Sequence, residues 1–176
     1  MKKKIFIGSE VIKKLNNNEY KIKGFSNNFI EKLSLKFPSE YLLIEGDGAK
    51  RRSIKTPASH EPVIPSTTKN LIVVMGMRNF GQKITKDNVF RFDRIKKLTS
   101  TNKIDEELIL NLFTSKVSYG SYLDNFENFT AVLNQIDNKN INRFLKIGKK
   151  LLKSALNKVI LADTSRNNPI LKIITK

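Results

Sequence analysis

The sequence has 176 residues, of which 39% are hydrophobic, and this length suits one globular domain with a real core. It contains no cysteine, which excludes disulfides and cysteine nucleophiles, and no apolar run near the roughly 20 residues that a membrane span needs. Its net charge of +17 invites a nucleic-acid partner, but abundant Lys, Asn and Ile are also what AT-rich coding produces, so charge alone does not favour one. We expect one cytoplasmic domain over residues 1–176, with no membrane partner.

Apolar runs and helical spacings alternate along the chain. The expected elements are a helix over 28–35, strands over 41–45 and 70–75, helices over 87–98 and 105–114, a strand over 130–133, a helix over 141–155, a strand over 159–162 and a shorter strand over 170–174. The apolar runs are near-continuous, which is typical of strands covered on both faces. The pattern predicts an α/β fold with an open, mostly parallel sheet flanked by helices, in which 41–45 and 70–75 are neighbouring parallel strands.

A long connection over 46–69 follows the expected strand 41–45, at the edge where open α/β sheets bind ligands. Glu45 ends that strand and Asp47 lies between two glycines, so the two carboxylates are candidate Mg²⁺ ligands beside a backbone that a phosphate can approach. The alternative is an ordinary glycine-rich turn with solvated acids.

Basic residues follow at once. Lys50, Arg51, Arg52 and Lys55 could hold an anion or a nucleotide phosphate, unless they form a solvated charge run. His60 and Glu61 are candidates for the same site, as a base and its orienting carboxylate, although a histidine that only fixes the loop is favoured.

A later strand end carries Asn134 and Asp137 in the segment LNQID. In P-loop proteins an Asn-Lys-x-Asp box at such a place reads guanine, but Gln135 stands where the lysine would be. The alternative is a strand-to-helix turn with Asp137 as a cap. No G-x-x-x-x-G-K-[ST] phosphate loop occurs anywhere in the sequence.

Several segments together resemble one known family. They are EGDGAKRRSIKTPASHEPVIP, TTKNLIVVMGMRNFGQKIT, Arg91 in VFRFDR, the stretch from KID to YGS, LNQID and KVILADTS. In these segments, which extend from about residue 44 to the end, the chain resembles the YqeC family of accessory proteins for selenium-dependent molybdenum hydroxylases.

The resemblance implies a P-loop NTPase-like domain that lacks its first βα unit and the phosphate loop, and therefore a truncated or split member of the family. It implies ATP or GTP with Mg²⁺ as cofactors, a molybdenum hydroxylase or its cofactor-maturation proteins as partners, and functional roles for Glu45, Asp47, Lys50, Lys55, His60 and Glu61. Because the phosphate loop is missing, we expect no nucleotide hydrolysis by this chain alone. The alternative function is a non-catalytic basic module that binds RNA or an acidic partner protein.

Overall fold

A computed structural model describes residues 8–16, 19–37, 41–126, 128–154 and 156–176. Contacts between the residues divide the chain into two compact units. The first unit comprises Met1–Ile44 with Val63–Thr67, and the second comprises Glu45–Pro62 with Thr68–Lys176. The single domain over 1–176 stays a prediction.

The first unit contains a hairpin and one helix. Strands β1 (Glu10–Asn16) and β2 (Glu19–Lys23) pair in antiparallel fashion, and the sequence analysis did not predict them. Helix α1 (Asn27–Lys36) confirms the helix expected over 28–35, and it begins where the Ser26 hydroxyl accepts a hydrogen bond from the amide of Phe29 at 3.3 Å.

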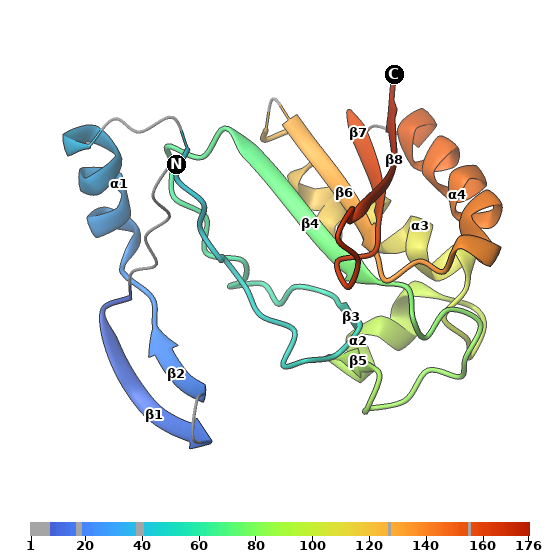
Figure 1. Cartoon of the computed structure of the whole chain (residues 1–176), viewed down its shortest axis with the longest axis horizontal. Coiled ribbons are helices and arrows are strands. Elements are labelled where there is room, and N and C mark those ends of the chain that lie inside the picture. The colour runs from blue at the N-terminus through green and yellow to red at the C-terminus, as the bar shows by residue number, and fades with distance from the viewer. Residues whose placement is uncertain (1–7, 17–18, 38–40, 127, 155) are drawn as a thin grey trace. The chain divides into compact units, whose positions relative to one another are not determined.

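The second unit is built on a four-stranded sheet in the order β4-β6-β7-β8 (Figure 1). Its strands are β4 (Asn70–Gly76), β6 (Asn128–Asn134), β7 (Lys158–Ala162) and β8 (Ile170–Thr175). The pairs β4–β6 and β6–β7 are parallel, whereas β7–β8 is antiparallel. The mixed α/β character, the mostly parallel sheet and four of the five expected strands are therefore confirmed.

The strand expected over 41–45 is wrong. This segment has no regular structure, and Tyr41 and Leu43 are 83% and 87% exposed. The neighbour of β4 is β6, paired from Asn70 opposite Asn128 to Gly76 opposite Asn134. A short apolar run forms a strand only where a partner strand pairs with it, and none of the described strands pairs with this run.

The helix expected over 87–98 is wrong in its first half. Val89 and Phe90 form strand β5 (Val89–Phe90), which pairs in parallel with β3 (Ile54–Lys55). Helical structure begins only at α2 (Phe92–Ile95) and continues as the 3-10 helix η1 (Lys96–Leu98). The Asn88 side chain accepts a hydrogen bond from the amide of Thr85 at 2.9 Å, which holds the preceding residues in a turn.

Two long helices agree with the expected ones. Helix α3 (Glu106–Thr114) begins at Asp105, whose side chain accepts from the amide of Leu108, and α4 (Ile141–Ser154) matches the amphipathic stretch over 141–155, with residue 155 outside the described part. The 3-10 helices η2 (Tyr119–Tyr122) and η3 (Asn138–Asn140) complete the unit. None of the described helices is long and apolar enough to cross a bilayer.

Helices α3 and α4 cover one face of the sheet (Figure 1). Phe113 of α3 packs near Phe129 of β6, with ring centroids 6.4 Å apart, and Gly148 of α4 faces Val159 and Ile174. The buried aliphatic side chains of this face, Val73, Met75, Ala131, Leu133, Val159 and Leu161, form the centre of the core.

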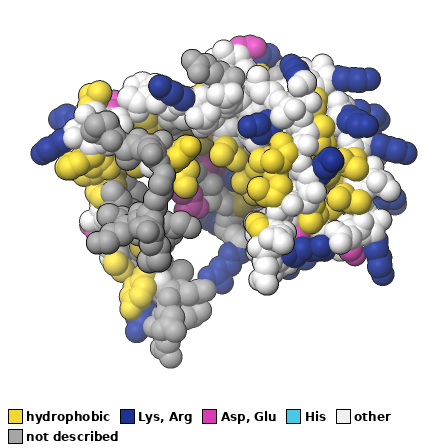
Figure 2. Space-filling model, turned by 45° about the horizontal axis from the view of Figure 1, so that its top comes forward, with side chains coloured by type: hydrophobic (Ala, Val, Ile, Leu, Met, Phe, Trp, Pro, Cys, Tyr) yellow, Lys and Arg dark blue, Asp and Glu magenta, His cyan; other side chains and the backbone are white. Residues whose placement is uncertain are grey.

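The opposite face differs from the prediction that the strands are covered on both sides. Ile72 and Val74 of β4 are 55% and 59% exposed, and Ile173 of β8 is 50% exposed. Strand β4 therefore alternates between buried and exposed side chains, which is typical of a sheet packed on one face. Figure 2 shows hydrophobic side chains exposed together on one face of the molecule, among lysine and arginine side chains.

Candidate functional site

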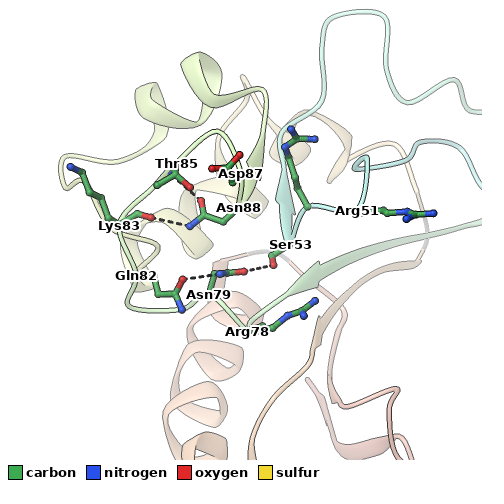
Figure 3. A pocket seen from close by; sticks show the side chains of 10 residues that line it. Arg51, Ser53, Arg78, Asn79, Gln82, Lys83, Thr85, Asp87 and Asn88 are labelled. Carbon is green, nitrogen blue, oxygen red and sulfur yellow. Dashed lines mark hydrogen bonds between the residues drawn. The ribbon is translucent and has the colours of Figure 1, made fainter.

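A pocket of about 560 Å³ lies where the carboxyl end of β4 meets the start of β3 (Figure 3). The backbone amide of Gly76 donates to the carbonyl of Ser53 at 2.7 Å and so joins the two strands. A Cβ at Gly76 would lie 2.5 Å from Oε1 of Gln135 and 3.3 Å from Cα of Ser53, so a larger residue there would require the Gln135 side chain to move. The residues that line this basic pocket are Arg51, Arg52, Ser53, Arg78, Asn79, Gln82, Lys83, Thr85, Asp87 and Asn88.

Hydrogen bonds between the lining residues fix the base of the pocket. The Ser53 hydroxyl donates to Oδ1 of Asn79 at 2.6 Å, and Nδ2 of Asn79 donates to Oε1 of Gln82 at 2.8 Å (Figure 3). Nδ2 of Asn88 donates to the Lys83 carbonyl at 2.9 Å. The acceptor atoms of these three amide side chains are therefore engaged within the protein.

The groups that remain available in the basic pocket are mostly donors. In the described part of the chain, the Arg78 guanidinium and the Lys83 ammonium make no hydrogen bond or ion pair, and Nε2 of Gln82 donates to nothing. Arg52 is oriented by the hydrogen bond from its Nε to the Lys86 carbonyl at 2.7 Å. Against four cations the pocket carries one carboxylate, Asp87, and this composition suits an anion.

A buried ion-pair cluster lies at the other end of β3. Lys55, only 5% exposed, pairs with Asp47 and lies 3.0 Å from Oε2 of Glu61, and its ammonium also donates to the Gly48 carbonyl at 3.1 Å. Arg91 donates to the same Oε2 of Glu61 at 2.5 Å. The Lys55 cluster, made of Asp47, Lys55, Glu61 and Arg91, thus ties the segment before β3 to the segment after β5.

The charges of the Lys55 cluster shift the pKa of its neighbours. Burial raises the pKa of the Glu61 carboxyl, but hydrogen bonds and charges from Arg91 and Lys55 outweigh it and lower the pKa to about 2. The Tyr122 hydroxyl donates to the Glu61 carbonyl at 2.9 Å, and burial with the charge of Asp47 raises its pKa. Glu61 is therefore ionised at neutral pH and held by two cations.

Phe90, next to Arg91, is surrounded by cations. Lys50, Lys55 and Arg91 lie 5.1 Å from the centroid of its ring, and Arg52 lies 6.0 Å from it. Cations are attracted to the face of an aromatic ring at such distances. Arg52 also lines the basic pocket, so it connects the Phe90 ring to that pocket.

Strained backbone conformations occur in the same region. Among the described non-glycine residues, those with positive φ are Lys50 (48°), Arg51 (64°), Arg91 (66°) and Gln135 (62°). Three of these four are cations at the basic pocket or at Phe90, and each conformation costs on the order of 1 kcal/mol for a residue with a Cβ. Such strain is most often found at ligand sites.

The two expected metal ligands, Glu45 and Asp47, differ in their burial and in their contacts. Asp47 is held by Lys55 through Oδ1, and its Oδ2 is buried without a hydrogen-bond partner, whereas Glu45 is exposed. Over the described ranges, no group of three His, Cys, Asp or Glu side chains could hold a metal ion. Glu45 and Asp47 can therefore supply at most part of a coordination shell, and Mg²⁺ would need oxygen atoms from its ligand as well.

The other expected site residues lie apart from the lining of the basic pocket. His60 is 74% exposed, with Nε2 3.7 Å from Oε1 of Glu61. Asn134 accepts from the amides of Gln135 and Thr164 and so joins the ends of β6 and β7. Asp137 accepts from the amide of Lys139 at 3.1 Å, which is the geometry of a cap. The nucleotide-binding roles of these residues stay predictions.

Sequence reasoning missed eight of the ten residues that line the basic pocket and named only Arg51 and Arg52. Arg78 and Asn79 follow directly after β4, and Lys83, Thr85 and Asn88 follow in the same loop. The rule that ligands bind at the carboxyl ends of parallel strands could have indicated them, since the strand over 70–75 was predicted. The spacing over 87–98 predicts a helix, so the sequence does not indicate that Phe90 lies in a strand beside these cations.

A comparison with known protein families matches the part of the chain that forms these sites. The family described as "YqeC protein" matches residues 2–93, which include β3, β5, the basic pocket and the Lys55 cluster. The chain belongs to the YqeC family. A curated member, "Uncharacterized protein YqeC" of Escherichia coli (strain K12), is 34% identical over 82 residues, or 47% of this chain.

The aligned part spans 32% of the length of that YqeC relative. No solved structure matches the chain. Membership of the YqeC family thus rests on the sequence of the first half of the chain. The fold described above rests on the structure of this chain and not on a solved relative.

Proposed function

We propose that this YqeC-family chain binds a phosphate-bearing anion, a nucleotide such as ATP or GTP, at the basic pocket. The single observation that supports this most is the chemistry of the pocket. The amide oxygens of Asn79, Gln82 and Asn88 already accept hydrogen bonds within the protein. The donors of Arg78, Lys83 and Gln82 stay available in the described part of the chain, beside one carboxylate, Asp87. A pocket of about 560 Å³ has room for more than one phosphate group.

Mg²⁺ is part of this proposal as a companion of the ligand. Mg²⁺ in proteins is commonly bound by one or two carboxylates together with substrate phosphates and waters. The carboxylates that would contribute are Glu45 and Asp47, whose Oδ2 accepts no hydrogen bond from a described residue. The Lys55 ammonium pairs with Asp47, so it competes with the metal ion for this carboxylate.

The biological role that follows from the family resemblance is that of an accessory protein. In this role the chain would act with a molybdenum hydroxylase or its cofactor-maturation proteins during maturation of a selenium-dependent enzyme. Binding rather than hydrolysis is expected, because the cations of the basic pocket lie on loops and the sequence lacks a G-x-x-x-x-G-K-[ST] loop.

Calorimetric titration with ATP and GTP tests the proposal. Arg78→Ala should weaken binding about tenfold, since it removes a charged donor that pairs with no residue in the described part of the chain. Lys158→Ala, which removes one exposed charge from β7, is the matched control and should change little. Equal losses for the two variants would contradict a defined pocket.

A second candidate function is supported by helix α4. Its exposed side carries Arg143, Lys146, Lys149, Lys150 and Lys153 and no acidic residue. Such a basic face suits RNA or an acidic partner protein, and binding to it should weaken steeply with salt whatever the nucleobase. Combined substitution of Lys146, Lys149 and Lys153 by Ala should abolish that binding and leave nucleotide affinity unchanged.

A further inference from the structure

Two neighbouring cations occupy the centre of a tight turn beside the basic pocket. The amide of Arg52 donates to the Ala49 carbonyl at 3.0 Å and closes the turn, and its central residues Lys50 and Arg51 have φ of 48° and 64°. Positive φ at both central positions strongly favours Asn and Gly, because a Cβ strains the backbone there. Lysine and arginine are therefore unexpected choices on conformational grounds.

The side chains of Lys50 and Arg51 lie in different places. The Lys50 ammonium lies 5.1 Å from the centroid of the Phe90 ring. Arg51 is among the residues that line the basic pocket, and its side chain points away from Thr85 and Asn88 (Figure 3). Arg52 belongs to both places, since it lines the basic pocket and lies 6.0 Å from the Phe90 centroid. Cationic side chains are thus present all the way from the basic pocket to the Phe90 ring.

The charge near Phe90 is not fully neutralised by the protein. Lys55 and Arg91 are compensated by Asp47 and Glu61 in the Lys55 cluster. Lys50 makes no ion pair with any described residue. A positive charge held in place without a carboxylate partner is available for a second anionic group.

We propose that the Lys50-Arg51 turn is a clamp that selects ligands with at least two anionic groups, such as the di- or triphosphate part of a nucleotide. This inference rests on the proposed function, because the first anionic group lies in the basic pocket near Arg78. The second group lies at Lys50 beside Phe90. Strained backbone persists where a site requires a side chain in a fixed direction, which explains why Asn and Gly are absent from the turn.

Calorimetric titration with inorganic phosphate and inorganic tripolyphosphate tests the clamp without any base. Lys50→Gly should weaken tripolyphosphate about tenfold and leave phosphate unchanged, because only the longer anion reaches Lys50. The same variant should raise the melting temperature, since glycine adopts positive φ without strain. A purely structural role for Lys50 would not change the ratio of the two affinities.

The variants Arg78→Ala and Lys158→Ala separate the possible failures. If Arg78→Ala weakens neither anion, or if the wild type binds neither, the proposed function is wrong. If Arg78→Ala weakens both anions and Lys50→Gly leaves their affinity ratio unchanged, the clamp alone is overturned. A loss for Lys158→Ala as large as that for Lys50→Gly would also overturn it, because the effect would then not depend on the position of the lysine.

Discussion

The Lys55 ammonium and Oε2 of Glu61 lie 3.0 Å apart, and the same oxygen accepts a hydrogen bond from Arg91. Lys55 is 5% exposed and Glu61 is 22% exposed, so this contact is shielded from most of the solvent. One carboxylate therefore joins β3 to the residue that follows β5. We therefore expect this shielded contact to contribute more to the free energy of unfolding than an exposed ion pair does.

Lys55→Met should lower the free energy of unfolding by about 3 kcal/mol, because it leaves Asp47 and Glu61 without their shared cation. Lys116→Met is the matched control, since Lys116 pairs with Asp124 at 3.0 Å while both side chains are more than two-thirds exposed. That change should cost at most about 1 kcal/mol. Urea unfolding followed by circular dichroism measures both values, and similar losses would show that the Lys55 cluster is not structural.

Stability should fall in acid as Glu61 is protonated. The folded-state pKa of about 2 lies below the ordinary value of 4.5, so the folded state favours the ionised carboxylate. The resulting stabilisation is complete above about pH 5 and is lost as the pH falls toward 2, and it amounts to roughly 3 kcal/mol. Glu61→Gln should remove that part of the pH dependence. A variant whose unfolding free energy keeps the wild-type dependence between these limits would contradict the assignment.

The alternation along β4 predicts opposite results for two neighbouring valines. Val73→Thr places a hydroxyl in the core, where Val73 is 6% exposed, and should cost about 1 to 3 kcal/mol. Val74→Thr changes a side chain that is 59% exposed and should stay within about 0.5 kcal/mol. Thermal unfolding of both variants is the measurement. Comparable losses would restore the prediction that β4 is covered on both faces.

Mg²⁺ binding should depend on the nucleotide. Titration of the protein with Mg²⁺ alone should give no measurable heat, because Lys55 competes for Asp47 and the described residues contain no group of three side chains that could hold a metal ion. With ATP present, Asp47→Asn should reduce the contribution of Mg²⁺ to binding, and Asp93→Asn at an exposed acid serves as control. Identical isotherms for wild type and Asp47→Asn would remove Asp47 from the metal site.

Asp137→Ala distinguishes base recognition from capping. The hydrogen bond from the Lys139 amide predicts a loss of about 1 kcal/mol in stability, the ordinary cost of removing a cap. Loss of a hydrogen-bond partner for guanine would instead weaken GTP by about 1 to 3 kcal/mol and spare ATP. Parallel titrations with the two nucleotides decide between the roles, and we expect equal affinities because the carboxylate is engaged.

The sequence predicted best those elements whose pattern is set by the core. Helix α4 follows from its amphipathic period, and β6 and β7 follow from apolar runs that pack against it. The run over 41–45 failed because strand formation depends on a partner that composition cannot show. The partners of Asp47 and Glu61 were missed for a similar reason, since Lys55 and Arg91 reach them only where β3 pairs with β5.

The hydrogen bond from Tyr122 to the Glu61 carbonyl makes the site optically observable. The sequence has four tyrosines and no tryptophan, so its ultraviolet emission comes from tyrosine alone. Tyr119 and Tyr122 lie beside the Lys55 cluster, and burial, together with the charge of Asp47, raises the pKa of each. Their phenols therefore stay protonated to a higher pH than exposed ones. The intrinsic tyrosine fluorescence of the unlabelled protein thus contains a signal from the residues around Glu61.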